Sequence, residues 1–442
     1  MNLITSKIKS TFLNLKKENI KIILITFLLS FVYYTSQIGK EVSTSFLGTP
    51  KIYLPGIVLT TALAFWIKPS AGIFPKEKLT TLLPISVIAL TFFMSAFPEA
   101  FIDQTSTALS ILIVNLCLLG LVISFARLHD WNLENYSLTI AVLFLLVALL
   151  HSLVAVLSFH NIAFHSLQRL DYIRLQGLPG NPNFLGQIIT PGLVSAVFLF
   201  FRFQRRQQQG ITLIALLTVL IFLSYSLLLT GSRGGILGFI IAFLTFSIAQ
   251  TKRPIKKVLY IILAVLIVFS LFILAQWMVN QGWVRGKLFE VGEGSGRIGI
   301  WMTAWNIFYS SDFLQVIFGH GNGFFSRSLR STHSVYVRFL VDYGLVGIFA
   351  LFLFVIGSIS VFLRKTQTHA DVQQNAFFIS GFTLVFSTGL VNNSIFGGMT
   401  AEYIFFMFIY GILFCKSKPQ KMKLKNQKNQ NYKIFTRFTD SR

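Results

Sequence analysis

Long apolar segments recur along the whole chain and alternate with short polar connections. A helix needs about 20 mainly apolar residues to cross the hydrocarbon core of a bilayer, and these segments approach that length. The pattern therefore predicts an all-α polytopic membrane protein with about 12 transmembrane helices. The predicted spans are residues 20–39, 52–67, 79–97, 106–126, 137–159, 184–201, 211–230, 234–250, 258–279, 343–363, 374–391 and 398–415.

Basic residues in the connections predict how the chain is oriented. Lys and Arg concentrate in a leader at residues 1–19, in every second connection and in a tail at residues 416–442. Such a bias marks the cytoplasmic side, so we place both termini in the cytoplasm, flanking a membrane domain at residues 20–415. It also accounts for the net charge of +23. The expected partner is therefore the lipid bilayer, and nucleic acid is not expected.

The composition narrows the chemistry that the chain could perform. Only 12% of its residues are charged, whereas soluble domains average about 25%. The two cysteines, Cys117 and Cys415, lie in apolar segments, which favours neither a disulfide nor a metal site. The chain has no glycine-rich phosphate loop, no paired zinc-binding histidines and no evident carboxylate pair in the predicted outer loops. We therefore expect no cofactor and no metal.

Three unusual polar segments fall on the predicted outer face. They are residues 160–183, the turn TGSRGG at 230–235, and the long loop at 280–342 before the tenth span. Each leads into a helix that runs inward, and the free N–H groups at a helix start attract anions. The predicted N-caps of these helices are Asn183, Ser232 and Thr332.

The turn also carries Arg233 between glycines, which is unusual between two apolar segments. Glycine lets the backbone approach a ligand, and the guanidinium fork of arginine suits phosphate oxygens. Arg174 and Arg297 are the expected partners from the neighbouring loops. Together the arginines predict a site for a phosphorylated lipid. The alternative is that each arginine only extends to the membrane interface.

His333 is the candidate general base. It follows two hydroxyl residues at a helix start, where the positive helix end favours a neutral imidazole that can accept a proton. The alternative is a capping or packing histidine. The other candidate contacts to glycan or acceptor are Asn181, Asn183, Ser232, Trp301, His320 and Tyr336. For three of these a simpler role stays open: a turn residue at His320, an interfacial anchor at Trp301 and packing at Tyr336. Arg338 and Asp342 are spaced for pairing on one helix.

These residues lie in motifs that resemble the O-antigen ligase and polymerase superfamily. The motifs are RLQGLPGNPNFLG at 174–186, TGSRGGILG at 230–238, GRIGIWMTAW at 296–305, IFGHGNGFFS at 317–326 and THSVYVRFLVDYGLVG at 332–347. They follow the family's order and cover about residues 170–350. One position departs from the pattern, because Ser334 follows the histidine where the family usually has Asn. The long outer loop is also modest in size for a lipopolysaccharide ligase.

The resemblance implies a GT-C-like fold with an active site at the outer face of the bacterial cytoplasmic membrane. Such enzymes transfer a glycan from undecaprenyl diphosphate to a hydroxyl of lipid A core, of a growing polysaccharide or of a protein. Residue by residue, Arg174 and Arg233 match the arginines assigned to the diphosphate, and Arg297 matches the outer-loop arginine. His333 matches the histidine proposed as general base, in an inverting reaction that needs no metal.

Other classes of function stay open at this point. A flippase or other transporter of lipid-linked glycans should carry its ionisable residues near the bilayer midplane, whereas here they gather at one face. A purely structural membrane subunit would need neither Arg233 nor His333. Within the enzyme class, the sequence does not separate a ligase from a polymerase.

Overall fold

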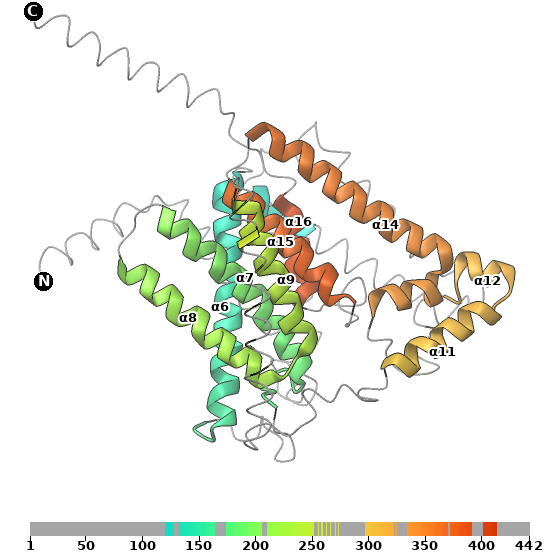
Figure 1. Ribbon diagram of the computed structural model, residues 1–442, viewed down its shortest axis with the longest axis horizontal. Coiled ribbons are helices and arrows are strands. Elements are labelled where there is room, and N and C mark those ends of the chain that lie inside the picture. Colours follow the sequence, from blue (N-terminus) through green and yellow to red (C-terminus); the bar gives the residue numbers. More distant parts are fainter. Residues whose placement is uncertain are drawn as a thin grey trace, which may run out of the picture.

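The computed structural model describes residues 120–127, 132–163, 174–205, 210–251, 297–321, 334–369, 372–390 and 401–412, with isolated positions between 255 and 324. The elements of these ranges are helices, as predicted (Figure 1). Their bounds are α6 Leu133–Phe159, α7 Pro182–Arg205, α8 Gly210–Thr230, α9 Arg233–Gln250, α11 Arg297–Ser310, α12 Phe313–Phe318, α14 Val335–His369, α15 Val372–Thr388 and α16 Ala401–Gly411.

Five of these helices are long and apolar enough to cross a membrane, which confirms a polytopic α-helical membrane protein. They are α6, α7, α8, α9 and the first part of α14, Val335–Gly357. The helices α6 to α9, α15 and α16 lie close to the spans predicted from 137 to 250 and from 374 to 415. The first three predicted spans, and most of 106–126 and 258–279, lie outside the described residues. The total of about 12 spans and the GT-C-like arrangement therefore stay predictions.

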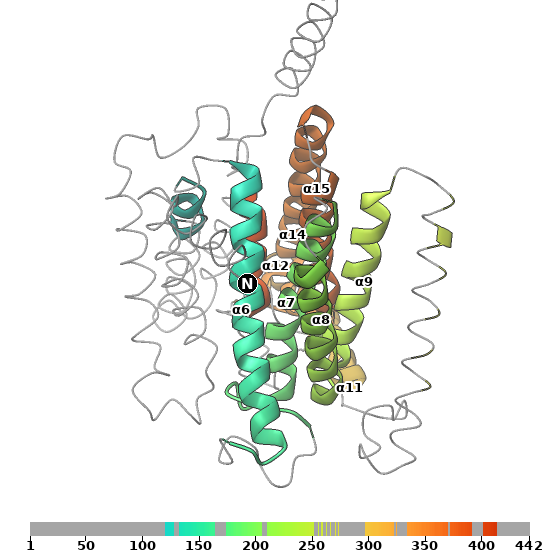
Figure 2. The same cartoon turned by 90° about the vertical axis from the view of Figure 1, so that its left-hand side faces the viewer.

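The bundle is built around α7, which is buried along most of its length, whereas α8 lies at the periphery, on the left in Figure 1 and toward the viewer in Figure 2. Small residues let the helices approach closely, because a side chain at Gly192 of α7 would collide with Ala148 of α6. Aromatic rings fill the wider gaps: Phe198 of α7 stacks on Phe377 of α15 with ring centroids 4.4 Å apart. This packing is typical of membrane helices, where close contact replaces the hydrophobic effect.

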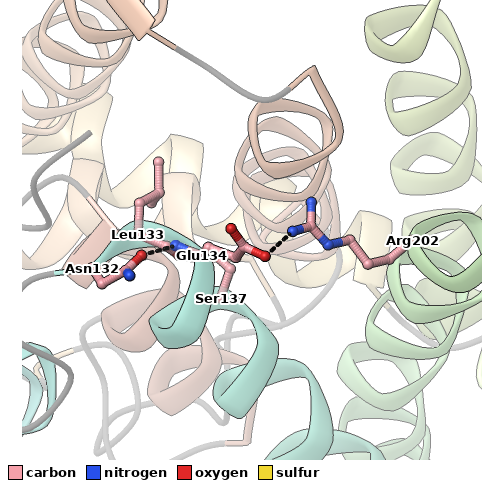
Figure 3. Close-up of polar contacts among 5 residues, drawn as sticks. All are labelled: Asn132, Leu133, Glu134, Ser137 and Arg202. Carbon is pink, nitrogen blue, oxygen red and sulfur yellow. Dashed lines mark hydrogen bonds and ion pairs between the residues drawn. The ribbon is translucent and has the colours of Figure 1, made fainter. Parts of the chain in front are cut away.

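One end of the bundle is held together by polar contacts. Glu134, near the start of α6, forms an ion pair of 2.6 Å with Arg202 in the last turn of α7 (Figure 3). The Gln373 side chain at the start of α15 donates a hydrogen bond of 2.7 Å to the Phe201 carbonyl. The helix α7 continues four residues beyond the predicted span 184–201, so Arg202 is a buried residue of the helix, where Glu134 balances its charge.

The opposite end, in the lower part of Figure 1, brings together the starts of α7 and α9 and the ends of α6 and α8. The end of α15 packs against α9 there, and the start of α14 is hydrogen-bonded to the residue that follows α15. We call this end of the bundle the arginine end. Two contacts define it: the Leu175 N–H donates to the Leu229 carbonyl at 3.0 Å, and the Val335 N–H donates to the Gly389 carbonyl at 2.9 Å. This alternation of helix directions agrees with the predicted topology. The assignment of the arginine end to the outer face stays a prediction.

The helix α14 begins eight residues before the span predicted at 343–363 and is kinked at Gly344, whose φ is 62°. The charged residues Arg338 and Asp342 lower the local hydropathy, so the hydropathy pattern predicts the start of the span after them, at residue 343. In the structure these two side chains pair at 3.3 Å, as their spacing predicted, and the Asp342 side chain is buried. Pairing lets the helix carry both charges on its first turns.

Candidate active site

The turn between α8 and α9 places Arg233 at the arginine end. Gly231 adopts a φ of 58°, a conformation that favours glycine. Ser232 caps α9 as predicted, because its side chain accepts a hydrogen bond from the Gly235 N–H. The Ser232 N–H in turn donates to Thr230 Oγ1 at 3.1 Å. These contacts fix the first residue of α9, so Arg233 starts from a defined backbone and extends its side chain toward solvent.

The guanidinium of Arg174 holds the same turn from the other side. Its Nε donates to the Thr230 carbonyl at 2.7 Å, and its Nη2 donates to the Gly231 carbonyl and to Asn183 Oδ1, both at 3.1 Å. One side chain thereby ties the loop before α7, the start of α7 and the α8–α9 turn together. Thr230 is a residue of this site that the sequence pattern did not single out, although a hydroxyl residue directly before the Gly-Ser of the turn is a weak signal for it.

The start of α7 lies against this turn. Its capping residue is Asn181, whose Oδ1 accepts from the Asn183 N–H at 2.8 Å, and not Asn183 as predicted. The helix begins earlier because Pro182 suits the first helical position. One helical turn later, Gly186 allows close packing, since a Cβ there would lie 2.6 Å from the Ser232 Cβ. The N-termini of α7 and α9 are therefore neighbours.

Arg297, the first residue of α11, is a second positive charge near Arg233. The pKa of Arg297 is lowered, first because burial disfavours its charged form and second because the positive charge of Arg233 lies nearby. Arginine still stays protonated in proteins, so an exposed positive charge at Arg233 and a partly buried one at Arg297 lie near each other. Two like charges held in this way favour an anion between them. That Arg233 and Arg297 bind one anion together stays a prediction.

The start of α14 reaches the same end through α15. Gly238 of α9 packs so closely on Thr388 of α15 that no side chain would fit there. The carbonyl of Gly389, the residue directly after α15, accepts from the Val335 N–H, and Tyr336 donates its hydroxyl hydrogen to the Phe386 carbonyl at 3.0 Å. Ser334 is buried and its hydroxyl accepts from the Val337 N–H.

The two remaining predictions for this helix start, the candidate base His333 and the N-cap Thr332, lie outside the described residues. The structure does anchor the residues that directly follow them at the arginine end.

His320 lies away from this helix start, at the kink of α14. Its Nε2 is 3.1 Å from the Ser311 hydroxyl, its Nδ1 is 3.3 Å from the Val341 carbonyl, and its ring stacks on Phe324. Trp301 is half-buried one turn after Arg297. Both stay predictions as glycan contacts. Among the described residues, no three His, Cys, Asp or Glu side chains gather as a metal site would require.

Comparison with known proteins identifies one part of the chain. Residues 216–352 match the family model described as O-antigen ligase. This segment contains most of α8, all of α9, α11 and α12 and the first half of α14, and with them Arg233, Arg297 and His333. A search of the curated proteins found no match. The match confirms the resemblance seen in the sequence, although the motif at 174–186, with Arg174, precedes it.

Proposed function

The chain contains a domain of the O-antigen ligase family, and from this premise we propose that it is a membrane glycosyltransferase that uses undecaprenyl-diphosphate-linked glycans. The observation that carries the proposal is the position of Arg233 at the capped start of α9, packed beside the start of α7, with the positive charge of Arg297 close enough to be affected by it. A diphosphate supplies the negative charge that two neighbouring guanidinium groups require. The N-terminus of α9 adds its free N–H groups and the positive end of the helix dipole.

The proposed reaction transfers the glycan to an acceptor hydroxyl with inversion. The acceptor oxygen attacks the anomeric carbon from the side opposite the diphosphate, and the bond between that carbon and the diphosphate oxygen breaks. His333 takes the proton of the hydroxyl as the new bond forms. Arg233 and Arg297, with Arg174 behind them, stabilise the charge that develops on the departing undecaprenyl diphosphate. In this proposal the arginines supply the electrostatic stabilisation, so no metal is required.

The surrounding residues have supporting roles in the proposal. Asn181, Asn183 and Ser232 line the two helix starts beside Arg174, and Trp301, His320 and Tyr336 come from the segment that holds Arg297 and His333. The acceptor is a hydroxyl of lipid A core, of a growing polysaccharide or of a protein. We place the site at the outer face of the bacterial cytoplasmic membrane, with both termini inside.

Reconstitution with a labelled undecaprenyl-diphosphate oligosaccharide and a panel of acceptors tests the proposal. Arg233→Ala should lower turnover about 10²–10³-fold, the usual cost of removing one group that stabilises the departing charge. Arg205→Ala is the matched control, because Arg205 is exposed in the last turn of α7 at the opposite end of the bundle. Ladders of repeats among the products would identify a polymerase, and single additions a ligase.

Two results would contradict this proposal. Full activity of Arg233→Ala would show that the diphosphate does not bind at Arg233. Movement of the labelled donor across the membrane without glycan transfer to any acceptor would favour a flippase instead.

A further inference from the structure

The helices α11 and α12 form a hairpin that is too short to cross a membrane. α11 has 14 residues, about 21 Å at 1.5 Å per residue, against a hydrocarbon core of about 30 Å. Asp312 makes the turn sharp: its carboxylate accepts from the Gln315 N–H, and the Gln315 side chain accepts from the Asp312 N–H. The hairpin therefore stays at the arginine end, where α11 begins with Arg297.

Both faces of α11 are apolar. The inner face packs on the first turns of α14, where Ala304 and Val341 are buried between Ile300, Ile307 and Val337. The outer face carries side chains at intervals of four, three and four residues, which places them on one stripe. Their exposed fractions are Ile298 69%, Met302 63%, Trp305 58% and Tyr309 83%. The turn into α12 extends this surface with the exposed Phe313 and Leu314.

The exposed stripe is continuous with the apolar surface of a membrane span. The His320 N–H donates to the Val341 carbonyl and the Gly321 N–H to the Asp342 carbonyl, both at 3.0 Å, so the end of α12 is fastened to the kink of α14. A Cβ at Gly344 would lie 2.5 Å from the Ile317 carbonyl oxygen. The exposed apolar face of α14, from Leu345 to Phe352, thus begins beside the last residue of α12, Phe318.

We propose that the stripe Ile298–Met302–Trp305–Tyr309 is a lipid-binding surface, and that the hairpin lies in the interfacial region of the bilayer at the arginine end. Six large apolar side chains in water would form a patch of the kind that soluble surfaces avoid. Trp and Tyr are the residues that favour the headgroup level of a membrane. A helix of this length cannot span the hydrocarbon core, so an apolar free face that carries Trp and Tyr is expected at the membrane interface.

This location has a consequence for Arg297. Because Arg297 is the first residue of α11, an interfacial hairpin would hold its guanidinium at the depth of lipid headgroups, where the Arg233 charge still acts on it. Lipid binding by the stripe does not depend on the proposed glycosyl transfer. It supplies a physical reason why the anion site would accept a lipid-borne phosphate in preference to a free one.

Nitroxide accessibility in the full-length protein tests the inference without any substrate. In a Cys117→Ser/Cys415→Ser background, single cysteines at Met302, Tyr309 and Ser310 are labelled and the protein is placed in nanodiscs of phosphatidylethanolamine and phosphatidylglycerol, one molecule per disc. Ser310 is the matched control, because it is exposed but points about 100° away from Tyr309 around the helix. The labels at 302 and 309 should collide severalfold more with oxygen than with a water-soluble nickel chelate. The label at 310 should show the reverse.

Two results would overturn the inference. Equal access of the nickel chelate to positions 309 and 310 would place the hairpin in water. Protection of 302 and 309 from both reagents would indicate a protein contact, such as a second copy. As a measurement that needs no label, brominated lipids should quench tryptophan fluorescence less in Trp305→Phe than in the unsubstituted protein. Because no step requires glycan transfer, failure here leaves the proposed function untouched.

Discussion

At the scale of single residues, Arg174 and Arg233 differ in how they are held. Three hydrogen bonds to fixed acceptors surround the Arg174 guanidinium, whereas Arg233 projects from the first position of α9. The sequence predicted the setting of Arg233 well, since the glycines and the capping serine are its direct neighbours. It could not predict the acceptors of Arg174, because the Thr230 and Gly231 carbonyls are brought to it only by tertiary packing.

This difference predicts opposite responses to lysine. Arg174→Lys keeps the charge but cannot reach three acceptors with one ammonium group, and each lost bond to a charged group costs about 1.5–3 kcal/mol. We therefore expect Arg174→Lys to lower the thermal stability in detergent and glycan transfer together. Arg233→Lys should keep the stability and part of the activity, because a charge remains at the helix start. Equal losses in the two variants would show that the hydrogen bonds of Arg174 are unimportant.

His333 gives the second prediction at this scale. As a general base it should contribute about 10²–10⁴-fold to turnover, so His333→Ala should lose most of the transfer while donor binding persists. Turnover and the binding of a labelled undecaprenyl-diphosphate glycan are measured on the same preparation. A capping or packing histidine would instead lower the melting temperature and leave turnover of the remaining folded protein unchanged, which would contradict the assignment.

At the scale of elements, hydropathy located α6, α7, α8 and α9 to within a few residues because lipid imposes one length on every span. It placed the start of α14 wrongly, since Arg338 and Asp342 interrupt the apolar pattern and only their pairing in space removes the penalty. The kink could not be read from the sequence either. Gly344 is one glycine among 31, and its positive φ follows from the close approach of α12.

The kink predicts a specific intolerance of side chains. Gly344→Ala must hold an alanine at a φ of 62° with its Cβ 2.5 Å from the Ile317 carbonyl oxygen, and the backbone strain alone costs about 1–3 kcal/mol. We expect a lower melting temperature and separation of the α11–α12 hairpin from α14. Gly299→Ala is the matched control in α11, because a Cβ there meets no atom within 4 Å. Equal stability of the two variants would show that α12 does not constrain the kink.

At the scale of the whole molecule, the sequence did not predict which helices lie at the centre of the bundle and which lie at its periphery. Both α7 and α8 are apolar enough to span a membrane, yet α7 is central and α8 peripheral. The difference comes from contacts with other helices, such as Gly192 against Ala148 and Gly186 against Ser232. The hydrophobic pattern of one span does not show which other helix will pack against it. The alternation of helix directions, by contrast, follows from connectivity and was predictable.

Orientation is the property of the whole molecule on which the proposed site depends, since lipid-linked glycans are used at the outer face. A membrane-impermeant maleimide tests it in intact cells with single cysteines in the background free of Cys117 and Cys415. Ser310→Cys, exposed at the arginine end, should be labelled from outside, whereas Gln204→Cys, exposed at the opposite end of α7, should react only after permeabilisation. The basic leader and tail predict this orientation, because Lys and Arg are enriched on the cytoplasmic side. Labelling of position 204 alone in intact cells would show that the arginine end faces the cytoplasm. That result would exclude a transferase that acts at the outer face.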